Sequence, residues 1–165
     1  MAGIDNNTIL YLRGDSFEDL SKNKIEIVNN GVTLINDGNF GKCFSFKNSS
    51  TFMYFVSDLF NFGTEDFTIE FFVKLNDTHS YHPLFMSGVS GTQGELTKCS
   101  IYECRNDYGG TLGTSGTKTI DSFGNYANIW IYVAMVRKDN VLKFYLDGKS
   151  TGDGKTQTYN LQNTR

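Results

Sequence analysis

The chain has 165 residues, which is long enough for one domain with a hydrophobic core, and its 15 basic and 18 acidic residues give a net charge of −3. This balance gives no electrostatic footprint for nucleic acid or an anionic membrane, and the sequence has no transmembrane stretch, so we expect neither nucleic-acid binding nor insertion into a membrane. Aromatic residues make up 15% of the chain, with 14 Phe and 9 Tyr but only one Pro, and this composition favours β-strands over helices.

The first part of the chain contains short strand signals separated by turns. Apolar or alternating runs predict strands at 8–12, 24–28, 32–35, 43–46 and 51–56. Asn29-Asn30-Gly31 is a hairpin-type turn, so we expect 24–28 and 32–35 to pair. No long stretch repeats at the three-to-four spacing of a helix.

The clearest strand follows Asp66. Strict alternation from Phe67 to Lys74 places Phe67, Ile69, Phe71 and Val73 on one face and Thr68, Glu70, Phe72 and Lys74 on the other. One apolar face and one mixed face are typical of a strand with one side in a core and the other in solvent.

The rest of the chain ends in a strong hairpin. Shorter runs at 83–87 and 98–103 predict two strands, and 88–124 is the loosest segment, rich in Gly, Thr and Ser. Residues 129–137 and 141–146 flank the turn 138–140, and Asp147-Gly148 ends the second strand. Strands without helices between them predict an all-β sandwich or barrel and not a parallel sheet. With no repeat and no Pro-rich linker, we expect a single domain over 1–165.

Four stretches carry a more specific pattern. They are 10–12 with the acidic turn 19–23; Phe40-Gly41-Lys42-Cys43-Phe44-Ser45-Phe46; the strand 66–74; and 130–137 followed by 144–148. In this order they resemble the laminin-G-like jelly rolls of the concanavalin A-like lectin and glucanase superfamily, whose motifs read FGKAxxF, DFTIEFWVK and WHHVAVVR…LYVDG. Phe72 replaces the usual Trp, and Ile131-Tyr132 replace the usual His pair. The resemblance implies a two-sheet antiparallel jelly-roll sandwich.

The end of the chain departs from that family. Further strands normally follow the Asp-Gly turn, whereas only 17 residues follow Gly148 here. Either the chain is truncated at its C-terminus, or the sandwich is short, or another chain covers the exposed edge. Because an uncovered strand edge pairs with neighbouring strands, we expect a homo-oligomer or docking of another subunit.

The same superfamily includes glucanases, so catalysis needs a test. A retaining glycosidase requires two carboxyl groups about 5 Å apart. The resemblance implies that they would alternate on one strand as Glu-x-Asp-x-Glu, but here Glu70 stands between Thr68 and Phe72. Glu95 and Glu103 are the alternative second carboxylates. We expect no enzymatic activity and a non-catalytic binding or adhesion module instead.

The outward faces of the strands offer a candidate glycan site. Glu70 and Phe72 share one face of their strand, and Lys143 and Tyr145 share the outward face of the last hairpin strand. Aromatic rings stack on sugar rings, and charged groups bind hydroxyls. The alternative is that the segment 88–124 covers Phe72.

Loop tips form a second candidate surface. Aromatic and polar residues gather in the expected loops, where binding residues often lie: Tyr81, His82, Asn106, Asp107 and Tyr108. The sequence alone does not rank this surface against the sheet face.

A candidate calcium site lies near the N-terminus. Asp15, Asp19 and Asn23 lie close together in one acidic stretch. Carboxylate and amide oxygens suit Ca²⁺, and some relatives that this fold resembles hold Ca²⁺ in their loops. The alternative is an ordinary acidic surface turn. No other cofactor is expected.

The opening residues 3–10 and the Asn-, Lys- and Ile-rich style resemble jelly rolls carried by phages and prophages of low-GC bacteria. This resemblance implies a place on a virion tail, fibre or capsid, or at a bacterial cell surface. The start at Met1 has no signal-peptide pattern, so we expect synthesis in the cytoplasm. The expected partners are glycans or cell-surface polysaccharide and other virion subunits. The alternative is a purely structural or decoration subunit of a virion.

Overall fold

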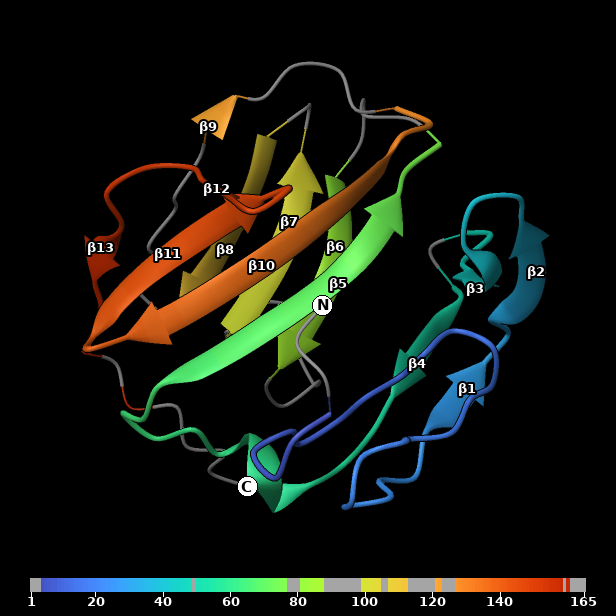
Figure 1. The fold of residues 1–165 in the computed structure, drawn as a ribbon, viewed down its shortest axis with the longest axis horizontal. Coiled ribbons are helices and arrows are strands. Elements are labelled where there is room, and N and C mark those ends of the chain that lie inside the picture. The colour runs from blue at the N-terminus through green and yellow to red at the C-terminus, as the bar shows by residue number, and fades with distance from the viewer. Residues whose placement is uncertain are drawn as a thin grey trace. The chain divides into compact units, whose positions relative to one another are not determined.

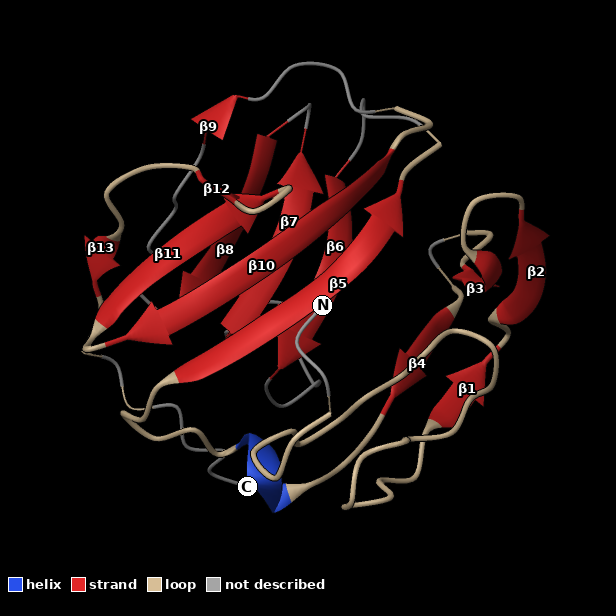
Figure 2. Ribbon diagram, viewed as in Figure 1, coloured by secondary structure: helices blue, strands red, loops and turns tan. Residues whose placement is uncertain are grey.

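A computed structural model of the chain describes residues 4–48, 50–76, 81–87, 99–104, 107–112, 121–122, 127–158 and 160. Between 81 and 122 the described side chains are those of Leu84, Phe85 and Ile101. Among the described residues the regular structure is strands and one short 3-10 helix, η1 (Asp58–Phe60), and no helix is long and apolar enough to cross a membrane (Figure 2). The chain divides into two compact units, 1–60 and 61–165.

The first unit contains two small antiparallel pairs. Its strands are β1 (Val28–Asn30), β2 (Thr33–Asp37), β3 (Gly41–Ser45) and β4 (Phe52–Tyr54). β2 pairs with β3, and β1 pairs with β4. The turn at 29–31 forms, because the Asn29 side chain bonds both the amide and the carbonyl of Val32. The hairpin predicted across it does not form, since Asn30 pairs instead with Phe52.

The second unit contains two larger antiparallel sheets. Its strands are β5 (Phe67–Lys74), β6 (Tyr81–Ser87), β7 (Cys99–Cys104), β8 (Asp107–Leu112), β9 (Asp121–Ser122), β10 (Trp130–Lys138), β11 (Val141–Leu146), β12 (Lys149–Ser150) and β13 (Lys155–Thr156). One sheet has the order β12-β11-β10-β5, with β13 also paired to β11. The other has the order β6-β7-β8-β9, and the two sheets lie in separate layers (Figure 1).

Two tight turns set the register of the first of these sheets. Asp139 and Asn140 have φ of 51° and 59°, and Asp147 and Gly148 have φ of 48° and 76°. Positive φ at both central residues is typical of the type I′ turn, whose twist matches the strands that it joins. The first turn joins β10 to β11, as predicted. The second, where the sequence predicted only the end of the strand, joins β11 to β12.

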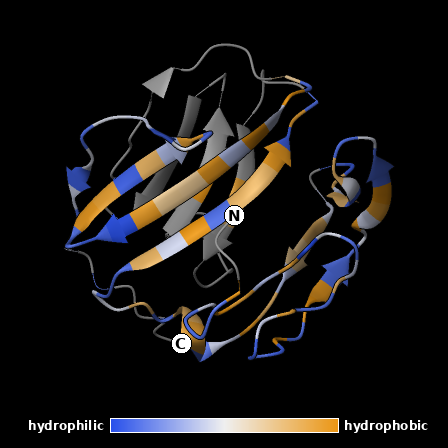
Figure 3. Ribbon diagram, viewed as in Figure 1, coloured by the Kyte–Doolittle hydropathy of each residue, from blue (hydrophilic) through white to orange (hydrophobic). Residues whose placement is uncertain are grey.

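The core lies between the two sheets. Alternation turns Ile131, Val133 and Met135 of β10 inward, and all three are no more than 1% exposed. They lie beside the inward apolar residues of β5, the neighbouring strand in the same sheet. Ile101 of β7 is also fully buried in this cluster, with Leu84 and Phe85 of β6 packed against it. The alternation of apolar and polar residues is visible along β5, β10 and β11 (Figure 3). The predicted all-β antiparallel fold is confirmed, and it is consistent with a concanavalin A-like jelly-roll sandwich.

A buried arginine closes one end of this inward row. Arg137 of β10 is 1% exposed, and its guanidinium lies 4.9 Å from the centre of the Phe67 ring. It donates hydrogen bonds to the carbonyls of Glu65 (2.8 Å) and Gly63 (2.9 Å). A single side chain thus holds the backbone that leads into β5 against the end of β10.

Candidate functional site

The outward face of β5, β10 and β11 brings together residues that are distant in sequence. Residues that pair directly across antiparallel strands share a face. Phe72 pairs with Tyr132, Lys74 pairs with Trp130, and Glu70 pairs with Ala134, which pairs in turn with Tyr145. The side chains therefore stand in three neighbouring rows, which we call the outer face.

The middle row is aromatic and accessible. The rings of Phe72 and Tyr132 are 5.2 Å apart between centroids and inclined at 50°, and Phe72 is 42% exposed. The Tyr132 hydroxyl donates a hydrogen bond to Oε2 of Glu70, which joins this row to the next. The pKa of Tyr132 is raised well above its ordinary value, mainly by burial and secondly by this hydrogen bond to a carboxylate. The phenol therefore stays protonated and keeps the carboxylate in place.

An ammonium group flanks the aromatic row on its other side. Nζ of Lys74 lies 5.4 Å from the centre of the Trp130 ring, a cation–π distance. Along β5 the outward order is thus carboxylate, aromatic ring, ammonium, at Glu70, Phe72 and Lys74. A strand rises about 3.3 Å per residue, so the Cα atoms of Glu70 and Lys74 lie about 13 Å apart.

The structure places all four predicted sheet residues on this face. Glu70 and Phe72 lie on β5, and Lys143 and Tyr145 are half-buried outward residues of β11. Three residues that the sequence reasoning did not select complete the arrangement, namely Lys74, Trp130 and Tyr132. Alternation puts each of them on an outward face, but only the pairing of β5 with β10 shows that they are neighbours. Their role in binding stays a prediction.

The second candidate surface belongs to strands, not to loop tips. Tyr81 and His82 begin β6, while Asp107 and Tyr108 begin β8. The backbone pairs each couple with the end of β7, so they lie two strands apart, at about 9–10 Å, at one end of the same sheet. Their side chains, and all of Asn106, lie outside the described residues. So does most of the segment 88–124, whose packing over Phe72 was the alternative to a glycan site on the sheet.

Glu70 has no second carboxylate at the neighbouring positions of its face. Its neighbours on β5 are Thr68 and Phe72, and its partner on β10 is Ala134. Glu103 lies on β7, in the sheet that packs against the opposite face of β5. Glu95 lies outside the described residues. These positions supply no acid pair for glycoside hydrolysis.

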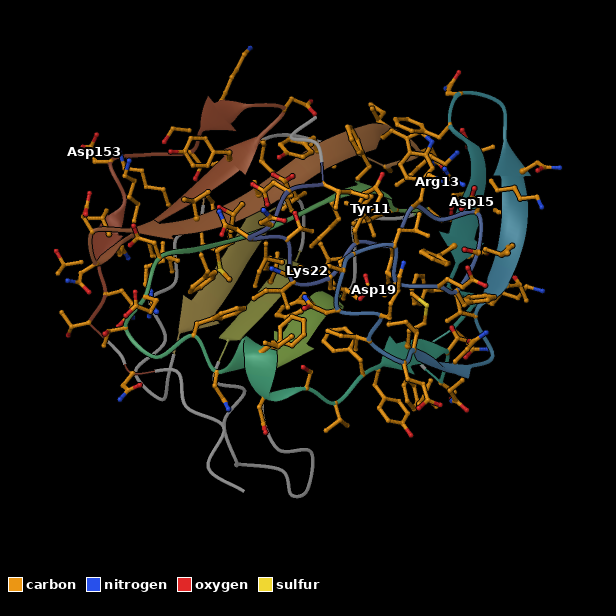
Figure 4. All side chains as sticks on the ribbon, turned by 60° about the horizontal axis from the view of Figure 1, so that its bottom comes forward. Tyr11, Arg13, Asp15, Asp19, Lys22 and Asp153 are labelled. Carbon is orange, nitrogen blue, oxygen red and sulfur yellow. The ribbon has the colours of Figure 1, made fainter. Side chains whose placement is uncertain are left out.

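Asp19 is the centre of a hydrogen-bond network in the first unit. Its side chain is buried, and its two oxygens accept bonds from the amides of Tyr11 (3.0 Å), Ser21 (2.8 Å) and Ile25 (2.9 Å) and from the Ser21 hydroxyl (2.7 Å). Figure 4 shows Asp19 and Tyr11 on the looped N-terminal segment. The run 8–12 forms no strand. Side chains bind part of its backbone instead, as the bond of Tyr11 to Asp19 shows.

The other two predicted calcium ligands are also engaged. Oδ2 of Asp15 pairs with the Arg13 guanidinium at 2.5 Å, and this pairing holds the pKa of the Asp15 carboxyl below its usual value. Oδ1 of Asp15 is buried without a hydrogen bond, and the Asn23 amide donates to the carbonyl of Ile9.

Calcium needs six to eight oxygens, and these side chains do not fit such a site as placed. In the part of the chain that the structure describes, no three His, Cys, Asp or Glu residues gather as metal ligands. The calcium expectation therefore has no support from this geometry.

Comparison with known families matches most of the chain to one family model. The family model described as the Concanavalin A-like lectin/glucanases superfamily matches residues 48–165, which include every strand of the second unit. A comparison with curated proteins finds no match.

Proposed function

Because the chain belongs to the concanavalin A-like lectin/glucanases superfamily, we propose that it is a non-catalytic module that binds glycans through the outer face of β5, β10 and β11. Members of this superfamily often bind carbohydrate, and its laminin-G-like and lectin-like members are generally non-catalytic. Fold alone does not assign a ligand, so the proposal depends on the chemistry of the face.

The observation that carries the proposal is the exposed aromatic pair beside a held carboxylate. Sugar rings present C–H groups to aromatic faces, and Phe72 with Tyr132 offers two such faces at 5.2 Å. Glu70 accepts from Tyr132 through one oxygen, and a carboxylate has further lone pairs for sugar hydroxyls. This hydrogen bond orders the carboxylate before binding, which lowers the entropic cost of recognition.

Replacing Phe72 with alanine is expected to weaken glycan binding by about 3- to 10-fold. Full burial of a Phe side chain contributes about 1.5–3 kcal/mol, a ligand can bury only the 42% of Phe72 that is exposed, and each 1.4 kcal/mol is a factor of ten in affinity. The measurement is a glycan array of the wild-type protein followed by titration of the best ligand. Phe52→Ala is the matched control, because Phe52 is 48% exposed but lies in the first unit. Equal affinity of Phe72→Ala and wild type would remove the outer face from the proposal.

The same array tests the remaining expectations. Loss of binding in EDTA would support a calcium site. Binding that is lost in Tyr108→Ala but kept in Phe72→Ala would move the site to the second sheet.

We place the module on a phage or prophage virion or at a bacterial surface, where it contacts cell-surface polysaccharide. The support for this location is the resemblance of residues 3–10.

A second candidate function is a structural subunit that assembles through protein contacts. Among the residues of the first unit that the structure describes, nine large apolar side chains are exposed, at residues 4, 28, 35, 40, 46, 52, 54, 56 and 59. Among the described residues, Val32 is the one buried hydrophobic side chain of that unit. Large exposed apolar patches often mark protein interfaces. A blank array together with a mass that grows with concentration in light scattering would favour this function.

A further inference from the structure

The charges of the outer face indicate what kind of glycan it binds. We propose that the ligand carries an acidic group, and that Lys74 binds this group while Phe72 and Tyr132 stack on the sugar. This inference rests on the proposed function and adds the class and orientation of the ligand.

The first observation is a local reversal of charge. The chain as a whole has a net charge of −3, yet the outward positions of β5, β10 and β11 carry three ammonium groups, Lys74, Lys138 and Lys143, and one carboxylate, Glu70. Asp147, in the turn after β11, adds a second carboxylate, which accepts a hydrogen bond from the Tyr132 amide at 2.9 Å, so the ammonium groups still outnumber the carboxylates. An excess of ammonium groups attracts an anionic ligand toward this face.

The second observation is the position of the ammonium group. Lys74 pairs across the strands with Trp130, in the row next to the Phe72–Tyr132 pair, and its Nζ lies 5.4 Å from the Trp130 ring centre. The ring attracts the ammonium electrostatically and restricts where it sits, so less side-chain entropy is lost on binding. A carboxylate on a stacked sugar can then pair with Lys74 at the edge of the aromatic row.

The third observation sets the direction of the ligand. Glu70 lies on the other side of the aromatic row, with one oxygen bonded to Tyr132. A carboxylate repels an anion and accepts hydrogen bonds from hydroxyl groups. The acidic group of the ligand therefore points to Lys74, and neutral hydroxyls point to Glu70.

The test is an array that carries each uronate oligosaccharide beside its methyl ester, with sulfated oligosaccharides of the same length. Preferential binding of the free acids supports a carboxylate ligand. If the sulfated sugars bind as well, the site accepts either a carboxylate or a sulfate as the acidic group. Equal binding of acids and esters overturns the inference but keeps the proposed function. A blank array overturns both.

Substitutions then assign the anion to its residue. Lys74→Gln is expected to lower affinity for the acidic ligand about tenfold and to reduce its dependence on salt, because the ion pair is lost. Lys74→Arg should retain most of the affinity. Lys149→Gln is the matched control, since Lys149 pairs with the inward residue Leu146 and so lies on the other face of the same sheet. Unchanged affinity in a folded Lys74→Gln protein would overturn the assignment.

Discussion

Replacing Arg137 with methionine is expected to lower the free energy of unfolding of the second unit by about 2–4 kcal/mol. Arg137 is 1% exposed, and its guanidinium donates to the carbonyls of Glu65 and Gly63. Methionine keeps an unbranched apolar side chain but donates nothing, so these part-buried carbonyls lose their partner. Each unsatisfied buried acceptor costs about 1–3 kcal/mol. The cation–π contact with Phe67 is lost as well.

Urea unfolding followed by Trp130 fluorescence measures this loss. The chain contains a single Trp, which lies on β10, so its emission reports on the second unit. Lys138→Met is the matched control, because it makes a similar change one residue away at an exposed position, and it should change stability by less than about 0.5 kcal/mol. An Arg137→Met protein as stable as Lys138→Met would show that the carbonyls find other partners.

The second unit was the more predictable part of the fold, because its signals are local. The alternation of 66–74 and the two turns at 138–140 and 147–148 define β5, β10, β11 and their inward faces. The first unit was less predictable. The turn at 29–31 is present, but β1 pairs with β4, more than twenty residues away, and no local pattern specifies a partner at that separation.

The candidate site likewise has features that local sequence predicts and features that depend on how distant strands pair. Periodicity of two is enough to place Glu70 and Phe72 on one face. The bond between Tyr132 and Glu70 joins residues 62 positions apart, and no local pattern gives the register of β5 against β10. Asp19 was predicted as a calcium ligand, but its carboxylate accepts hydrogen bonds from the chain's own backbone and from Ser21. A sequence shows that a carboxylate is present, but it does not show that backbone amides already surround it.

Asp19→Asn is expected to lower the local stability of the N-terminal loop by about 2–4 kcal/mol, the second large effect that the structure predicts. The carboxylate accepts from three backbone amides and one hydroxyl, whereas the asparagine amide nitrogen presents hydrogens to some of the same donors. The first unit has little buried apolar surface to compensate. Amide hydrogen exchange at Tyr11, Ser21 and Ile25 measures the effect where it arises, and exchange should be faster at all three.

The pH dependence gives an independent check. Burial alone would raise the pKa of Asp19, but hydrogen bonds from the Tyr11 and Ile25 amides and from Ser21 outweigh it, so the pKa lies below the ordinary value of 3.8. A carboxyl group with a lowered pKa in the folded state stabilises that state fully above its unfolded pKa. This contribution is lost as the pH falls below about 4 and through the folded-state pKa.

Wild-type protection of these three amides should therefore decline on acidification, while Asp19→Asn starts lower and changes less over the same range. The exposed neighbour Glu18, changed to Gln, serves as the control and should behave as wild type. Equal acid sensitivity of wild type and Asp19→Asn would mean that another carboxylate controls the loop, and Asp15, paired with Arg13, would be the next residue to replace.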